Sequence, residues 1–156
     1  MGPGGDSTVL PGEGRAATHL IGRYCKGKGE AAAFTALEWV QSQCREKLGF
    51  IPYPGTANLR VEPQEAARLR QLAESKGVRL ISPSAAYCDA LCLTTRLKRK
   101  EGSRFLDGVL VFPLVGGYYS TIVEFLCPVE VKAELQLTEE EEMLLVVLPE
   151  DHQEGD

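Results

Sequence analysis

This 156-residue sequence has few histidines and no closely spaced pair of cysteines. It contains two histidines, which lie far apart near the two ends, and its five cysteines form no CxxC pair. A zinc site needs clustered Cys and His ligands at short spacing, so the sequence argues against one. An odd number of cysteines without a regular framework instead fits reduced thiols in the cytoplasm.

The sequence also lacks a net positive charge and long apolar runs. The formal net charge of -5 gives no overall attraction to a nucleic acid, and no apolar run approaches the length of a transmembrane helix. Residues 1–14 lack the cationic start and the apolar stretch of a signal peptide. We therefore expect a cytoplasmic protein that binds neither nucleic acid nor membrane. The one basic cluster, residues 96–100, fits a solvated hairpin end, with an anion-guiding rim as the alternative.

The apolar content is sufficient for one hydrophobic core. With 44% hydrophobic residues, the chain can form one domain and is too short for two ordinary ones. We expect this domain to cover residues 16–148 and to be a monomer. Residues 1–15 and the acidic tail 149–156 are predicted to be disordered, because they have too few apolar residues to offset the entropy cost of ordering.

Two longer helices are predicted from start and stop signals. Residues 35–38 read Thr-Ala-Leu-Glu, which is a capping box, and Phe34 and Trp39 flank the start as a hydrophobic staple. This helix should end at Gly49. A second helix should run over residues 63–76, with Pro at its first position and Gly after its end.

The remaining apolar residues come in short runs of strand length. Strands are predicted at residues 18–24, 58–61, 78–81, 90–97, 106–112, 121–126 and 144–148. Strands and helices do not alternate regularly, so the pattern favours an antiparallel barrel with helices at its side over a doubly wound sheet.

Two segments on either side of the first helix indicate a nucleotide and magnesium site. The turn Gly27-Lys28-Gly29-Glu30 can bring backbone N–H groups against phosphate. In the segment 52–59, Thr56 and Asn58 offer neutral oxygens to a hard metal ion. Taken singly, each segment could also be a simple turn.

Two common nucleotide motifs match the glycine turn incompletely. Residues 22–28 follow a Walker A loop up to Gly29, which stands where Ser or Thr should hold magnesium. Residues 27–32 also satisfy the GxGxxA form of a dinucleotide turn, but that loop should open directly into a long helix within alternating strand and helix units. The capping box places the helix start several residues later.

The stretch from Gly22 to Leu59 resembles the CTP-dependent riboflavin kinases of the archaeal type. That family has a Gly-x-Gly-Glu-Gly loop, a Leu-rich helix ending in Leu-Gly-Phe, and a Pro-Tyr-Pro-Gly-Thr-Leu-Asn-Leu segment. The counterparts here are residues 27–31, 48–50 and 52–59, and a looser match continues through residues 123–135. The resemblance implies a mainly β fold, namely a cradle-loop, Greek-key, six-stranded β-barrel with two or three added helices.

The resemblance also implies the residues of the site. The nucleotide would be bound by two segments of the chain, made up of Gly27, Lys28, Gly29, Glu30, Ala31 and Ala32, and of Val129, Glu130, Val131 and Lys132. One Mg²⁺ would be bound by Thr56 and Asn58, whose neutral oxygens are sufficient where phosphates supply the negative charge. Gly116 and Glu124 would contact the flavin, and Glu124 is the candidate catalytic base, with anchoring of a hydroxyl as its alternative role. The implied reaction transfers the γ-phosphoryl group of CTP to the terminal ribityl hydroxyl of riboflavin and yields FMN and CDP.

Two positions depart from the family pattern. Ala31 replaces the second glycine of the loop, and Gly116 stands where the family usually has a flavin-contacting Thr. Tyr118, Tyr119, Ser120 or Thr121 could replace that hydrogen bond. A catalytically inactive flavin- or nucleotide-binding homologue is therefore the alternative function. A DNA-binding barrel is a third, which the acidic balance disfavours.

Overall fold

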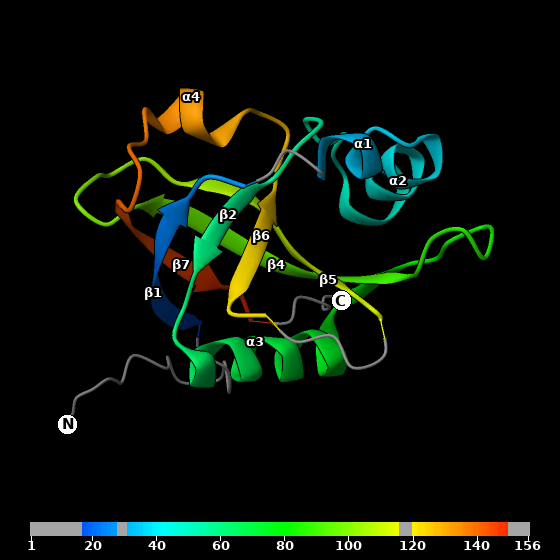
Figure 1. Ribbon diagram of the computed structural model, residues 1–156, viewed down its shortest axis with the longest axis horizontal. Coiled ribbons are helices and arrows are strands. Elements are labelled where there is room, and N and C mark those ends of the chain that lie inside the picture. The colour runs from blue at the N-terminus through cyan, green and yellow to red at the C-terminus, as the bar shows by residue number, and fades with distance from the viewer. Residues whose placement is uncertain (1–16, 28–30, 116–119, 150–156) are drawn as a thin grey trace.

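Seven strands in the described part of the chain form one antiparallel sheet that closes on itself. The computed structural model describes residues 17–27, 31–115 and 120–149. The strands are β1 (Thr18–Cys25), β2 (Ala57–Arg60), β3 (Val78–Leu80), β4 (Ala90–Arg99), β5 (Leu106–Pro113), β6 (Ile122–Leu126) and β7 (Glu142–Val147). Their order is β3-β4-β5-β6-β2-β1-β7, and a further pairing of β4 with β7 closes a ring of six strands, to which β3 is added (Figure 1). The predicted six-stranded barrel is confirmed.

The long strand β4 closes the barrel. Its residues 90–92 pair with β3, and its residues 95–99 pair with β7. In its first half the side chains are buried on both faces: Leu93 belongs to the barrel interior, whereas Cys92 belongs to a second cluster beneath the first helices. The continuous apolar run Ala-Leu-Cys-Leu at the start of β4 is the pattern expected of a strand segment that is buried on both faces.

Helix α3 (Pro63–Lys76) covers one end of the barrel (Figure 1). Pro63 occupies the first turn, where a missing N–H costs no helical hydrogen bond. Ala66, Leu69 and Ala73 are buried against the barrel core. The helix ends at Gly77, where a Cβ atom would lie 2.5 Å from the Ala73 carbonyl oxygen.

Three short helical segments form the second layer. These are α1 (Ala31–Thr35), α2 (Glu38–Gln43) and the π-helical turn η2 (Cys44–Leu48), which ends at Gly49 with a φ of +85°. They pack on the outside of the barrel through Val40 and Cys44, which are fully buried. A short helix, α4 (Val131–Leu135), follows β6. No helix among the described residues is long and apolar enough to cross a membrane.

The predicted helix start at Thr35 is wrong. The helix breaks between α1 and α2, and the residue that precedes α2 is Leu37, which makes no side-chain cap. Thr35 is buried, and its Oγ1 accepts a hydrogen bond from the N–H of Gly55 at 2.7 Å. The predicted packing of Phe34 on Trp39 is confirmed, since their ring centroids are 5.7 Å apart.

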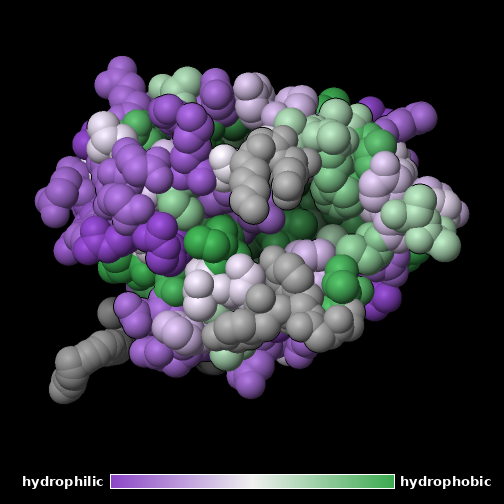
Figure 2. Space-filling view, in the orientation of Figure 1, coloured by the Kyte–Doolittle hydropathy of each residue, from purple (hydrophilic) through white to green (hydrophobic). Residues whose placement is uncertain are grey.

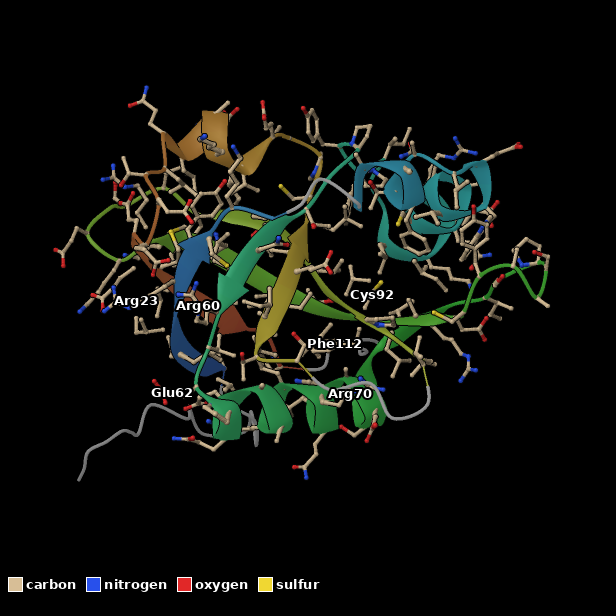
Figure 3. All side chains as sticks on the ribbon, in the orientation of Figure 1. Arg23, Arg60, Glu62, Arg70, Cys92 and Phe112 are labelled. Carbon is tan, nitrogen blue, oxygen red and sulfur yellow. The ribbon has the colours of Figure 1, made fainter. Side chains whose placement is uncertain are left out.

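The basic cluster at 96–100 ends the β4–β5 hairpin, as predicted. Arg96 pairs with Asp107 at 2.7 Å, and Arg99 and Lys100 pair with acidic residues that precede or begin β7. Two further pairs join the cross-strand neighbours Arg23 of β1 and Arg60 of β2 (Figure 3) to Glu142 and Glu140, which begin or precede β7. Exposed pairs of this kind add little to the stability of the fold.

The predicted disorder of residues 1–15 and 149–156 falls outside the described residues, apart from Pro149.

Candidate active site

The turn before β2 is anchored on three sides. The N–H of Tyr53 donates to the Cys127 carbonyl at 2.9 Å, and the N–H of Gly55 donates to Thr35. From α2, Gln41 Nε2 donates to the Pro52 carbonyl at 3.2 Å. Gly55 has a φ of +132°, a backbone conformation that favours glycine. The turn thereby holds the next residue, Thr56, in a fixed position.

Three oxygen-bearing side chains meet at this point. Thr56 Oγ1 donates to Glu124 Oε1 at 2.9 Å and lies 3.4 Å from Asn58 Oδ1. The register of β2 and β6 explains the meeting, because Asn58 and Glu124 are direct cross-strand partners. One carboxylate and two neutral oxygens form a donor set that fits a hard cation such as Mg²⁺.

Gly27 lies directly against Asn58. A Cβ atom at this position would lie 1.9 Å from Asn58 Nδ2, so no larger residue fits while Asn58 keeps its position. The start of the glycine turn is therefore in contact with one of the two predicted metal ligands.

Two cavities meet at Thr56, which lines both. The first, the polar hollow, has a volume of about 220 Å³, and its lining includes Tyr24, Tyr53 and residues 129–132. The second, the aromatic slot, has a volume of about 240 Å³. Its lining includes Phe34, Thr35, Tyr87, Cys88, Ala90, Val111, Pro113 and Glu124. The face of the molecule shown in Figure 2 is hollowed near its centre, with hydrophobic residues at the floor.

The structure brings most of the predicted site residues together. Thr56, Asn58, Glu124 and Gly27 are in contact, and Val129, Glu130, Val131 and Lys132 line the polar hollow. Ala32 lies in α1, where its carbonyl accepts the Thr35 hydroxyl at 3.3 Å. Lys28, Gly29, Glu30 and Gly116 lie outside the described residues, as does the side chain of Ala31.

Sequence reasoning missed several residues of both cavities. Tyr24 lines the polar hollow, and burial, followed by the nearby charge of Glu139, raises the pKa of its phenol. Tyr87 and Cys88 reach the aromatic slot from the loop between β3 and β4, which carries no motif. Exposed aromatic residues in a loop were the available signal, and alone they are weak.

The fold is a small closed antiparallel β-barrel, and the oxygen cluster of Thr56, Asn58 and Glu124 lies on it beside Gly27. The family model CTP-dep_RFKase, described as "Domain of unknown function DUF120", matches residues 24–147. The chain therefore belongs to this family, and its resemblance to CTP-dependent riboflavin kinases of the archaeal type is confirmed.

Similar curated proteins carry the name riboflavin kinase. The protein from Pyrobaculum calidifontis is 31% identical over 135 residues, which cover 85% of this chain and 61% of that protein. The protein from Methanothermobacter thermautotrophicus is 32% identical over 112 residues, covering 71% of this chain and 84% of that protein. The Archaeoglobus fulgidus protein is 31% identical, and the chain spans 49% of its length.

Proposed function

We propose that this chain is a riboflavin kinase that transfers the γ-phosphoryl group of CTP to the terminal ribityl hydroxyl of riboflavin, giving FMN and CDP. The observation that supports this most strongly is the position of Thr56, which lines the polar hollow and the aromatic slot alike. A phosphoryl donor in the polar hollow and an acceptor in the slot would meet at this residue. Phosphoryl transfer depends mainly on such positioning.

The nucleotide is assigned to the polar hollow. Its lining includes Tyr24, Tyr53 and residues 129–132, among them Lys132. Gly27 begins the turn that would approach the phosphates from the Asn58 side. These residues would hold the donor with its terminal phosphate toward Thr56.

Thr56 and Asn58 would hold one Mg²⁺ through their side-chain oxygens. When bound, the ion neutralises negative charge on the nucleotide phosphates. Glu124 is assigned to the acceptor, where its carboxylate accepts a hydrogen bond from the reacting hydroxyl and orients it. A strong base is not required for this reaction class, so anchoring is the role we assign.

A binding homologue without catalysis is the second candidate. It is favoured by Gly116, which replaces the flavin-contacting Thr usual in the family. Among the neighbours that could replace this Thr, Ser120 is engaged elsewhere, because its Oγ accepts the N–H of Ile122 at 2.9 Å.

The assignment of the metal ligands is tested with Thr56→Ala and Asn58→Ala. Each variant should lose at least about 100-fold in kcat for FMN formation, because metal-supported charge stabilisation is removed. Both should stay folded, since neither side chain is part of the hydrophobic core. The matched control is Thr94→Ala, an exposed threonine of β4 that lines neither cavity, and it should retain activity. Full activity in both site variants would overturn the assignment.

A further inference from the structure

The helical layer is interrupted between α1 and α2, beside the turn that leads into β2 (Figure 1). Leu37 has a φ of -62° and a ψ of 144°, which are extended backbone angles, so the helix does not continue through it. Thr35 is the last residue of α1, and the carbonyl groups at the end of a helix have no partner within that helix. The break therefore allows the carbonyl of Thr35 to bond a group outside α1.

The hydroxyl of Thr35 is held from two sides. It accepts the N–H of Gly55 at 2.7 Å and donates to the carbonyl of Ala32 at 3.3 Å. Thr35 is only 1% exposed, so water cannot readily take the place of this hydroxyl. Removing one partner of a buried hydrogen bond costs more than the bond itself contributes, because the other partner is left unsatisfied. The hydroxyl thus fixes the turn against α1.

Gln41 of α2 joins the same helix and the same turn by a second route. Its Nε2 donates to the carbonyl of Thr35 at 2.6 Å and to the carbonyl of Pro52 at 3.2 Å. A side-chain amide has two N–H groups, so one glutamine can hold both carbonyls at once. Gln41 is not among the residues that line the polar hollow or the aromatic slot. Its contacts therefore indicate that it acts through the turn and not on a substrate.

The turn determines where Thr56 lies. Asn58 and Glu124 are fixed by the ladder between β2 and β6, which begins at Ala57 and does not include Thr56. The side chain of Thr56 nevertheless comes within 2.9 Å of Glu124 and within 3.4 Å of Asn58. Its position relative to them therefore depends on the turn, which is held on its helical side by Thr35.

We propose that Thr35 and Gln41 are positioning residues for the magnesium site, because they hold the turn so that the Thr56 hydroxyl stays beside Asn58. This inference rests on the proposed function, since it assumes that Mg²⁺ binds at Thr56 and Asn58. The break between α1 and α2 is then part of the site, because it supplies the Thr35 carbonyl that Gln41 binds. Such positioning is important, since a displacement of about 1 Å can reduce a rate about 100-fold.

The test is CDP binding without flavin, measured by titration calorimetry with and without Mg²⁺. In the unaltered protein Mg²⁺ should lower the dissociation constant of CDP, because the ion joins the phosphates to the ligand oxygens. Gln41→Leu should reduce this gain by at least about fivefold, the effect of about one hydrogen bond, and should leave binding of metal-free CDP nearly unchanged. A merely structural role would lower the melting temperature and leave the gain from Mg²⁺ as it is.

Thr35 is tested by removing its hydroxyl alone. Thr35→Val keeps the branched shape and should lose the gain from Mg²⁺ by a similar factor, whereas Thr35→Ser keeps the hydroxyl and should restore most of it. Thr35 also lines the aromatic slot, so Gln41→Leu is the variant that acts away from both cavities.

The matched control is Gln64→Leu, an exposed glutamine of α3, which should keep the full gain. An undiminished gain in Gln41→Leu or in Thr35→Val would overturn the role of that residue and leave the proposed function standing. If Mg²⁺ does not strengthen CDP binding by the unaltered, folded protein, the metal assignment of the proposed function fails, and this inference fails with it.

Discussion

At the level of single residues, the contact between Gly27 and Asn58 links the turn proposed to bind phosphate to one of the two proposed metal ligands. The two residues lie close together because Cys25, at the end of β1, pairs with Asn58 in the β1–β2 ladder. Where the turn leaves β1, its backbone therefore passes directly over the Asn58 amide. The glycine at 27 is required by this close approach and not by an unusual backbone angle.

The first prediction concerns Gly27→Ala. The new methyl group must displace Asn58, so the KM for CTP should rise and kcat should fall, together by at least about tenfold in kcat/KM. Gly27 is exposed, and the melting temperature should change little. Steady-state kinetics of FMN formation and a thermal melt check both statements.

Gly49→Ala provides the control. Gly49 ends η2 at a φ of +85°, and no atom lies within 4 Å of the position that a Cβ would take, so the substitution strains the backbone without a steric clash. It should cost about 1 kcal/mol of stability and leave kcat/KM unchanged, because Gly49 lines neither cavity. A Gly27→Ala protein with normal kinetics would contradict the contact with Asn58.

The sequence identified Thr56, Asn58 and Glu124 as site residues, and the structure places them together. These residues could be identified because the resemblance to the family rests on motifs at fixed spacing, whereas composition alone gives no positions. Thr35 shows the limit of local reasoning. Thr35 and Glu38 have the spacing of a capping box. The Thr35 hydroxyl nevertheless accepts a hydrogen bond from the N–H of Gly55, a partner that only tertiary folding brings near.

At the level of elements, the β3–β4 loop depends on the charge of Asp89. The backbone hydrogen bond from Ser82, and then that from Arg79, lower the pKa of the Asp89 carboxyl below its usual range. A group whose pKa is lower in the folded state stabilises that state when ionised. Its contribution is complete above the unfolded pKa of about 3.9 and is lost as the pH falls through the folded pKa.

The second prediction follows from the lowered pKa of Asp89. Asp89→Asn keeps the shape and loses the charge, so it should be less stable than the unaltered protein at pH 7, and the difference should shrink as the pH falls below about 4. Urea unfolding across this range measures it. A difference that does not depend on pH would show that the charge is unimportant to the loop.

The strands could be predicted from the sequence, and the helical layer only in part. All seven predicted strands are present with shifts of one or two residues at their ends, because their apolar runs are bounded by turn residues. The break between α1 and α2 was missed, since no glycine or proline marks it. The closure of β4 onto β7 joins residues nearly fifty positions apart and leaves no local signal.

At the level of the whole molecule, the packing of the barrel and of the helical layer leaves the five cysteines unequally accessible. Four are buried, and Cys88 is partly exposed. Burial raises the pKa of Cys44 to about 11 and raises that of Cys92 further. Because the thiolate is the reactive form, buried thiols of this kind react slowly with thiol reagents.

The third prediction is that one thiol reacts fast in the folded protein and all five react in denaturant. A colorimetric thiol reagent should show a single fast equivalent, and Cys88→Ser should remove it. Riboflavin should slow this fast phase, because Cys88 lines the aromatic slot. Several equivalents reacting at one rate would contradict the buried positions of the other four.

The most direct measurement is FMN formation from riboflavin and Mg²⁺ by the unaltered protein, with CTP and ATP compared in parallel. The account predicts FMN in amounts that match CDP, formed faster with CTP than with ATP, and lost when Mg²⁺ is chelated. No FMN with either nucleotide from a folded sample would contradict it and would favour the homologue that binds without catalysis.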